Sequence, residues 1–105
     1  MTTVTIHSGI CGFSVTVTAE KAPDRKVRIS LDTECEMVQK MTNDVSLLDM
    51  MAAFTGFQRN AVYRSAAKHL KHVACPVPSG ILKAIEVELG FALPKDARIL
   101  FSKKE

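Results

Sequence analysis

The chain lacks the long apolar runs and sorting signals that would place it in a membrane or outside the cell. No stretch of apolar residues approaches the roughly 18 that a membrane-spanning helix needs. Residues 1–5 have neither the basic nor the apolar region of a secretion signal. We therefore expect a cytoplasmic protein.

An excess of one charge is also missing. Lysine and arginine number 14 against 11 aspartates and glutamates, which gives a net charge of +3. This excess is small and dispersed, so it does not require an anionic partner. Because no nucleic-acid recognition motif accompanies it, we expect neither nucleic acid nor a membrane among the partners.

The motifs that usually identify an enzyme are absent as well. The sequence contains no Gly-x-Ser-x-Gly elbow, no Gly-x-x-x-x-Gly-Lys phosphate loop and no His-Glu-x-x-His helix. The tetrad Cys-Gly-Phe-Ser at residues 11–14 resembles the active site of monothiol glutaredoxins. In that family the tetrad opens a helix, whereas here the following residues alternate as in a strand. An enzyme hypothesis therefore has no identified general base, and a non-catalytic role is favoured.

The composition is ordinary for one folded domain. Hydrophobic residues make up 47% of the 105 residues and charged residues 24%, which is close to the globular average. A chain of this length can bury one core without disulfides or metals. Because we find no repeat, low-complexity tract or linker, we predict a single α+β domain over residues 1–105.

Alternating apolar and polar residues predict strands in the first third of the chain. Residues 3–7, 13–19 and 27–32 follow this period of two and are rich in β-branched side chains. Gly9 and Gly12 lie between the first two strands, where a tight connection needs positive backbone angles. One face of the resulting antiparallel meander is aliphatic and the other polar, so helices should cover only the aliphatic face.

The periodicity becomes helical from Thr33 onward. Thr33 and Glu36 fit a capping box, Asn60 can cap a later helix, and Gly90 is a suitable helix stop. Apolar residues at helical spacing predict helices over 33–41, 46–54, 60–70 and 78–89. Residues 97–102 are then predicted to form a last strand. The predicted fold is two-layered, with three to four helices on one face of the sheet, in the order β-β-β-α-α-α-α-β.

Only three cysteines are present, and no two of them form a Cys-x-x-Cys pair. In an up-down-up meander, the first turn and the end of the third strand lie at the same edge of the sheet. Cys11 lies in that turn, and Cys35 lies just past the third strand. Cys75 precedes the last helix. The start of this helix returns to the same edge if the helix packs antiparallel to the strand that follows it and if that strand runs parallel to the third. The topology therefore predicts that Cys11, Cys35 and Cys75 meet.

Three such cysteines could bind a metal. Helix N-termini favour thiolate over thiol, and Cys35 and Cys75 are both predicted to lie at such ends. Three thiolates could hold zinc or an iron–sulfur cluster, with a fourth ligand from water, a partner or a histidine. His7, before the first turn, and His72, three residues before Cys75, are the nearest histidines. The lead hypothesis is therefore a metal or cluster site formed by Cys11, Cys35 and Cys75.

The same residues allow other interpretations. Free cysteines often pack as small hydrophobes, in which case all three are structural. The polar sheet face or an uncovered edge strand could join two copies as a homodimer, which would make the protein an interaction domain. Cys35 or Cys75 could instead be the nucleophile of a thiol-dependent redox enzyme. A structural disulfide is disfavoured by the odd number of cysteines and the expected cytoplasmic location.

Five segments spread along nearly the whole chain form a recognisable set. They are Gly-Ile-Cys-Gly-Phe at 9–13, Cys-Glu at 35–36, Cys-Pro-Val-Pro at 75–78, the Ile-Leu-Lys helix that follows, and Leu-Pro at 93–94. Together they resemble a small prokaryotic domain family of unknown function that contains three cysteines. The resemblance implies that the three cysteine segments belong together, and it implies no activity.

Overall fold

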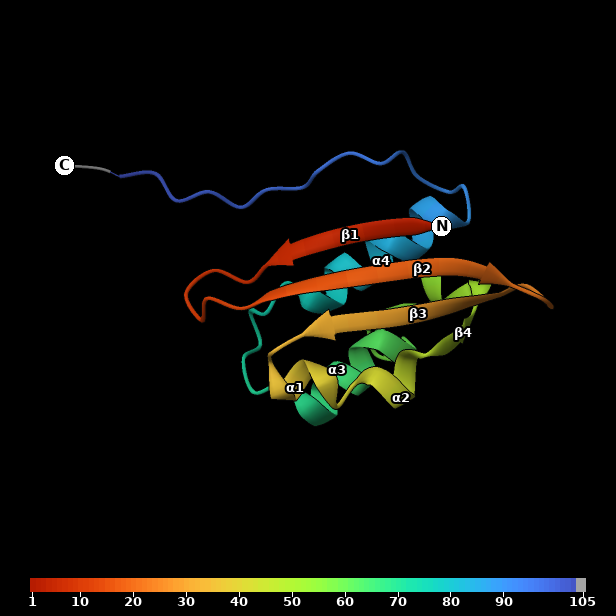
Figure 1. The fold of residues 1–105 in the computed structure, drawn as a ribbon, viewed down its shortest axis with the longest axis horizontal. Coiled ribbons are helices and arrows are strands. Elements are labelled where there is room, and N and C mark those ends of the chain that lie inside the picture. The colour runs from red at the N-terminus through yellow and green to blue at the C-terminus, as the bar shows by residue number, and fades with distance from the viewer. Residues whose placement is uncertain (104–105) are drawn as a thin grey trace.

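The computed structural model of the protein describes residues 1–103 and confirms the predicted α+β class (Figure 1). A four-stranded antiparallel sheet has the strand order β1-β2-β3-β4. Its strands are β1 (Thr2–His7), β2 (Ser14–Ala22), β3 (Lys26–Thr33) and β4 (Leu47–Asp49). The helices are α1 (Glu36–Gln39), α2 (Thr42–Val45), α3 (Ala61–His69) and α4 (Val77–Glu88), and a 3-10 turn, η1 (Met50–Ala53), follows β4.

The first three strands form the predicted meander. Val4 pairs with Val17, and Val17 pairs with Leu31, so the apolar residues of adjacent strands share one face. Between β1 and β2 the chain turns at Gly9 and Gly12, whose φ angles are +90° and +77°. Both angles lie in the left-handed region that favours glycine.

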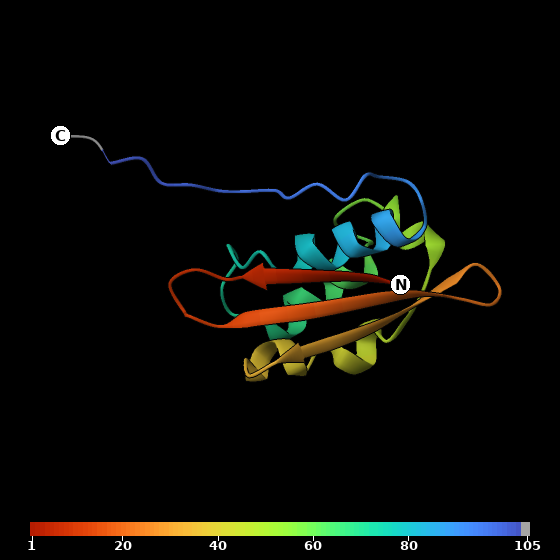
Figure 2. The ribbon, with the colours of Figure 1, turned by 45° about the horizontal axis from the view of Figure 1, so that its top comes forward.

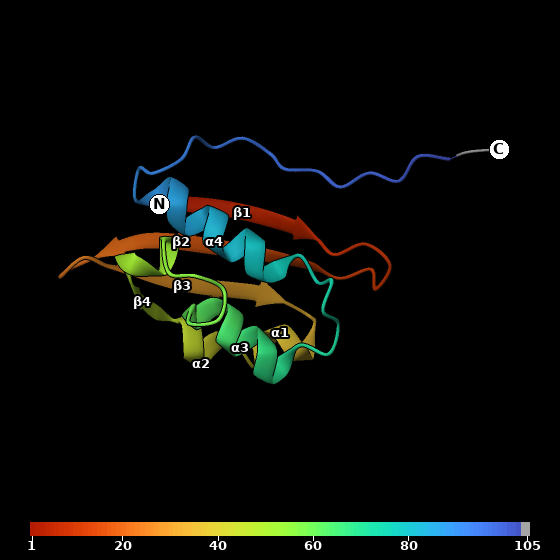
Figure 3. The same ribbon diagram turned by 180° about the vertical axis from the view of Figure 1, so that it is seen from behind.

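Helices cover one face of the sheet, as the alternation predicted. The views from the two sides, in Figures 1 and 3, show the sheet on one side of the molecule and the helices on the other. The core lies between them and contains Val15 and Val17 from the sheet with Ile81 and Ile85 from α4, all fully buried. Asn60 caps α3 as predicted, because its side chain accepts hydrogen bonds from the N–H groups of two residues in the first turn.

The fourth strand of the sheet is formed by a segment that the sequence predicted to be helical. Residues 46–54 were expected to be helical, but Leu47–Asp49 pairs with β3, opposite residues 26–28. Pairing with the free edge of β3 satisfies backbone groups that a helix would have satisfied internally. The helical turn then begins late, at η1, where the Asp49 side chain accepts a hydrogen bond from the Met51 N–H at 2.9 Å. The predicted last strand, residues 97–102, has no regular secondary structure.

The segment after β3 also departs from the predicted capping box. Thr33 Oγ1 accepts a hydrogen bond from the Cys35 N–H at 3.1 Å, and Cys35 itself is the residue that precedes α1. The predicted helix over 33–41 is reduced to the four residues of α1, and the expected stop at 42–44 falls within α2. Met41, between these helices, is fully buried, so core packing bends the chain where the periodicity suggested one helix.

Glu88, in the last turn of α4, ties this helix to the sheet. Thr2 Oγ1 donates to Glu88 Oε1 at 2.8 Å, and the Lys21 N–H donates to Oε2 at 3.0 Å. The Met1 ammonium group lies 3.3 Å from Oε1, and the Glu88 side chain is only 9% exposed. Burial acts to raise the pKa of Glu88, but the hydrogen bonds from Thr2 and Lys21 and the nearby ammonium group lower it below its usual 4.5.

We expect Glu88→Gln to lower the free energy of unfolding by about 1–2 kcal/mol near neutral pH, because the substitution removes charge-assisted hydrogen bonds. The folded pKa of Glu88 lies below 4.5. Its contribution is therefore complete above that pH and is lost as the pH falls through the folded pKa. Urea unfolding at several pH values should show the two proteins converging in acid. A stability difference that does not change with pH would contradict this role.

The helix α4 approaches β1 closely at Gly80. A methyl group built on Gly80 would overlap Cδ1 and Cγ1 of Ile6. Gly80 and Ile81 are buried, and Ile6 is 7% exposed. The absence of a side chain at Gly80 therefore lets the helix backbone pack directly on a core residue of β1.

Gly80→Ala should destabilise the fold by about 1–3 kcal/mol through overpacking, although alanine is the better helix former. In an Ile6→Ala background the new methyl group enters vacated space, so the same substitution should cost less. A double-mutant cycle from chemical denaturation measures this coupling. Strictly additive effects would show that the two side chains do not compete for space.

Candidate metal centre

The three cysteines come from three different parts of the fold, and all are free thiols. Cys11 lies in the hairpin between β1 and β2 and is exposed. Cys35 precedes α1 and is 8% exposed, so it packs as part of the core. Cys75 lies two residues before α4 and is half-buried against the core.

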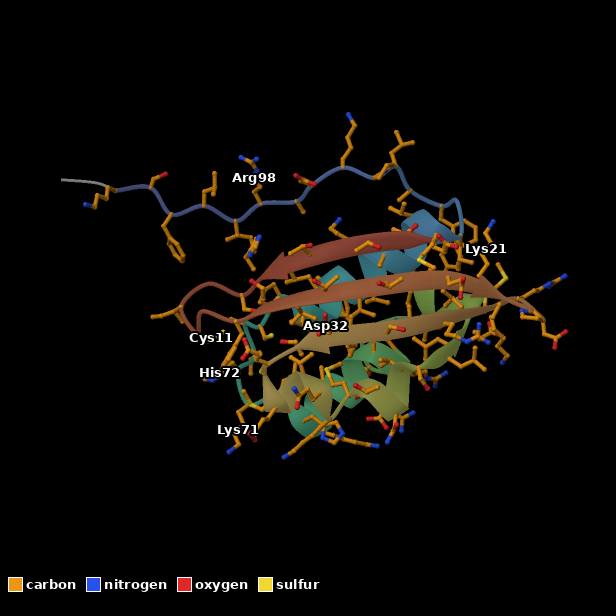
Figure 4. The ribbon with its side chains drawn as sticks, in the orientation of Figure 1. Cys11, Lys21, Asp32, Lys71, His72 and Arg98 are labelled. Atoms are coloured by element: carbon orange, nitrogen blue, oxygen red, sulfur yellow. The ribbon has the colours of Figure 1, made fainter. Side chains whose placement is uncertain are left out.

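The topology brings these segments to one end of the molecule, which we call the cysteine rim: Cys11, Cys35 and Cys75. The helix α4 ends beside the start of β1, where Glu88 bonds to Thr2, so it begins near the end of β1. Figures 1 and 3 show the β1–β2 hairpin, the end of β3 and the segment before α4 together at this end. Figure 4 places Cys11 and His72 there.

Burial, the start of α4 and the other two cysteines all affect the pKa of Cys75. Burial raises the pKa of Cys75 most strongly, and a hydrogen bond from the backbone N–H of Val77, at the start of α4, acts against it. Negative charge on Cys35 and on Cys11 raises the pKa further. Both of the other cysteines thus act on Cys75 in the same direction as its burial.

The raised pKa of Cys75 differs from the sequence prediction of a stabilised thiolate. A position at a helix N-terminus predicted a stabilised thiolate, and the helix does supply an N–H group to the sulfur, from Val77. Burial and the two neighbouring thiols outweigh that hydrogen bond, so the pKa is raised. Without a cation, the Cys75 side chain is therefore held as a neutral thiol near neutral pH.

The rim is not arranged as a finished metal site. Over residues 1–103, no group of three or more His, Cys, Asp or Glu side chains has the spacing needed to hold a metal ion. Cys35 and Cys75 pack against the core, whereas Cys11 lies in an exposed loop with Ile10, which is fully exposed. The structure thus brings the three predicted residues to one end without bringing their sulfurs to ligand spacing.

The two candidate histidines lie in different surroundings. His7 points to the polar face of the sheet, opposite to its buried neighbour Ile6, and its Nδ1 lies 3.0 Å from Ser14 Oγ. His72 belongs to the same turn as Cys75, because the Cys75 N–H donates to the His72 carbonyl at 3.1 Å. His72 is therefore linked through the backbone to a cysteine of the rim, whereas His7 faces away from the helices.

Thr33 has a positioning role that the sequence did not predict. Its hydroxyl group donates to the Ser14 carbonyl at 2.9 Å and accepts from the Cys35 N–H at 3.1 Å. Gln39 Nε2 also donates to the Thr33 carbonyl at 2.7 Å. One side chain thus fixes the residue before α1 relative to the start of β2. A threonine at the end of a strand is too common a signal to reveal this long-range bond.

A shallow hollow of about 350 Å³ lies beside the rim, between the β1–β2 hairpin and the segment that leads into α1. It is lined by Gly12, Phe13, Ser14, Asp32, Thr33 and Glu34. Ser14 and Asp32 belong to the strand positions whose side chains face the uncovered side of the sheet. The hollow is therefore adjacent to Cys11 and Cys35 in sequence and opens on the polar face.

Comparisons with known proteins are consistent with the three-cysteine resemblance. A family of unknown function, DUF6951, matches residues 2–101. The chain belongs to this family. Searches of the curated proteins and of the solved structures found no match. The family match includes all three cysteine segments and most of the segment after α4, but it assigns no reaction or ligand.

The fold also bears on the membrane expectation. None of the helices within residues 1–103 has the length and apolar character needed to cross a bilayer. The longest of them, α4, has only 12 residues, against about 20 for a membrane span.

The raised pKa of Cys75 should lower its reactivity toward alkylating reagents. At mildly alkaline pH, Cys75 should be alkylated more slowly than the same residue in the urea-unfolded chain, because less of it is thiolate. Cys35→Ser should move the midpoint of the Cys75 alkylation profile to lower pH, since it removes a negative neighbour. Peptide mass spectrometry after timed alkylation measures both effects. A midpoint unchanged by Cys35→Ser would contradict the electrostatic coupling.

Proposed function

We propose that this protein binds a metal ion or an iron–sulfur cluster through Cys11, Cys35 and Cys75. What supports the proposal is the fold: the β1–β2 hairpin, the end of β3 and the segment before α4, which carry the three cysteines, lie together at one end of the molecule (Figures 1 and 3). These residues come from a hairpin, a strand end and a helix start that are far apart in the sequence.

A bound cation would offset the repulsion between negative charges on the three cysteines. Negative charge on Cys11 and on Cys35 raises the pKa of Cys75, which favours its neutral thiol. A bound cation replaces this repulsion by attraction and allows all three thiols to ionise. Binding would therefore release protons, and the affinity should rise with pH.

The structure suggests how the sulfurs could reach ligand spacing. Cys35 and Cys75 are fixed by core packing, and Cys35 is fixed further by Thr33. Cys11 lies on an exposed loop with two glycines in the left-handed region. A movement of this loop is therefore the least costly way to bring the third sulfur to the other two.

His72 is the fourth ligand that the geometry favours. It lies in a turn with Cys75, at a spacing of three residues, and it is not hydrogen-bonded to Ser14 as His7 is. With His72, the set would be Cys3His, a common structural zinc site; without it, the open position suits water or a cluster iron. The proposal includes a cytoplasmic location, where thiols remain reduced.

A thiol-dependent redox enzyme is the less favoured alternative. A nucleophilic cysteine works as a thiolate, so enzymes lower its pKa. The pKa of Cys75 is raised instead, chiefly by burial. This difference argues against Cys75 as an activated nucleophile.

The proposal predicts metal in protein purified without oxygen, or stoichiometric binding of added zinc. Elemental analysis for zinc and iron, together with sulfide determination, measures the first, and titration calorimetry measures the second. Cys11→Ser is the sharpest variant, because Cys11 is exposed and its loss should not disturb the core. We expect it to weaken zinc binding at least roughly tenfold while the thermal unfolding of the metal-free protein is unchanged.

His72→Ala and His7→Ala form a matched pair for the fourth ligand. His72→Ala should weaken binding, whereas His7→Ala should leave it unchanged. Protein that is metal-free, binds no added zinc and accepts no cluster on reconstitution would refute the proposal. Equal effects of the two histidine variants would refute only the assignment of His72.

A further inference from the structure

The segment after α4 exposes an unusual amount of apolar surface. Every residue from 91 to 103 is exposed, and Ile99, Leu100 and Phe101 are 86%, 78% and 99% accessible. Three adjacent large apolar side chains in water are a common mark of an interaction surface. The family match runs through residue 101, so this segment is part of the shared domain.

The sheet offers one long unprotected edge. With the order β1-β2-β3-β4, the outer strands are β1, of six residues, and β4, of three. Natural edge strands usually carry lysine, proline or a bulge that prevents pairing with another chain. The sequence of β1, Thr-Thr-Val-Thr-Ile-His, has no lysine and no proline, and it pairs with β2 without a bulge. Val4, although it faces the helices, is only half-buried at this edge.

The segment does not fill the edge of its own sheet. It runs beside β1 in the same direction, yet among the described residues no backbone hydrogen bond joins residues 97–103 to β1 (Figures 1 and 3). In Figure 4, Arg98 lies level with the end of β1. Figure 2 shows the chain continuing past the hairpin. Because Arg98 is level with the end of β1, the described residues that follow it extend beyond their own β1.

We propose that residues 97–102 add as a strand to the free edge of β1 in a second copy of the chain, in a reciprocal dimer. Both segments have six residues. Ala97, Ile99 and Phe101 share one face at a period of two, as Val4 and Ile6 do in β1. That face extends the core side of the partner's sheet, and Arg98, Leu100 and Ser102 lie on its other, uncovered side. Reciprocal exchange buries the same surface in both copies and closes the assembly at two chains.

The test compares two double variants that add the same charge to opposite faces of the segment. Light scattering after size-exclusion chromatography, across a dilution series, should show a dimer for the natural chain. Ile99→Lys with Phe101→Lys should raise the dissociation constant more than tenfold. Leu100→Lys with Ser102→Lys should leave it within a few-fold. Because every substituted side chain is exposed in the single chain, all variants should fold, which circular dichroism checks.

A second comparison tests the edge itself. Thr3→Lys with Thr5→Lys gives β1 the charged side chains of a protected edge and should also dissociate the dimer. Amide hydrogen exchange in residues 97–101 should be slow in the natural chain and fast in both dissociating variants. A monomer, whether its segment exchanges fast or is protected on its own β1, would overturn the proposal. A dimer that survives the Ile99 and Phe101 substitutions, or that both double variants disrupt equally, would overturn it as well.

Discussion

The packing of α4 on β1 and β2 determines where the remaining features lie. Gly80 lets the helix backbone meet Ile6, and Glu88 anchors the end of the helix to Thr2. A helix of 12 residues is about 18 Å long, and a strand of six residues is about 20 Å long. An antiparallel helix that ends at the start of β1 must therefore begin near its end, beside the hairpin. Cys75 reaches the cysteine rim for this reason.

At the cysteine rim, opposing effects act on the pKa of Cys75. A helix N–H group stabilises negative charge on Cys75, while burial and two other thiols oppose it. The balance raises the pKa of Cys75 and favours its neutral thiol, and the proposed cation would favour the thiolate instead. The raised pKa argues against Cys75 as an activated nucleophile.

The proposed dimer contact lies along the outer backbone edge of β1, away from the cysteine rim. It does not depend on metal binding. The backbone edge of β1 faces away from β2, whereas the rim lies at the end of the hairpin that follows β1. The segment that would pair with this edge leaves α4 at the end remote from Cys75, where Gly90 turns the chain with a φ of +82°. The two proposals can therefore fail or succeed separately.

Local patterns in the sequence determined the meander, the Asn60 cap, the last helix and its stop at Gly90, because neighbouring residues decide each of them. Strand direction in the meander also places the Cys11 turn and the end of β3, next to Cys35, at one edge, whereas the prediction for Cys75 depended on a last strand at 97–102 that does not form. The tertiary structure alone decided that residues 47–49 pair with β3 and that residues 97–102 remain unpaired, because both depend on which distant edge is free. It also decided the protonation of Cys75. Burial cannot be read from local sequence, and at this position it outweighs the helix N-terminus.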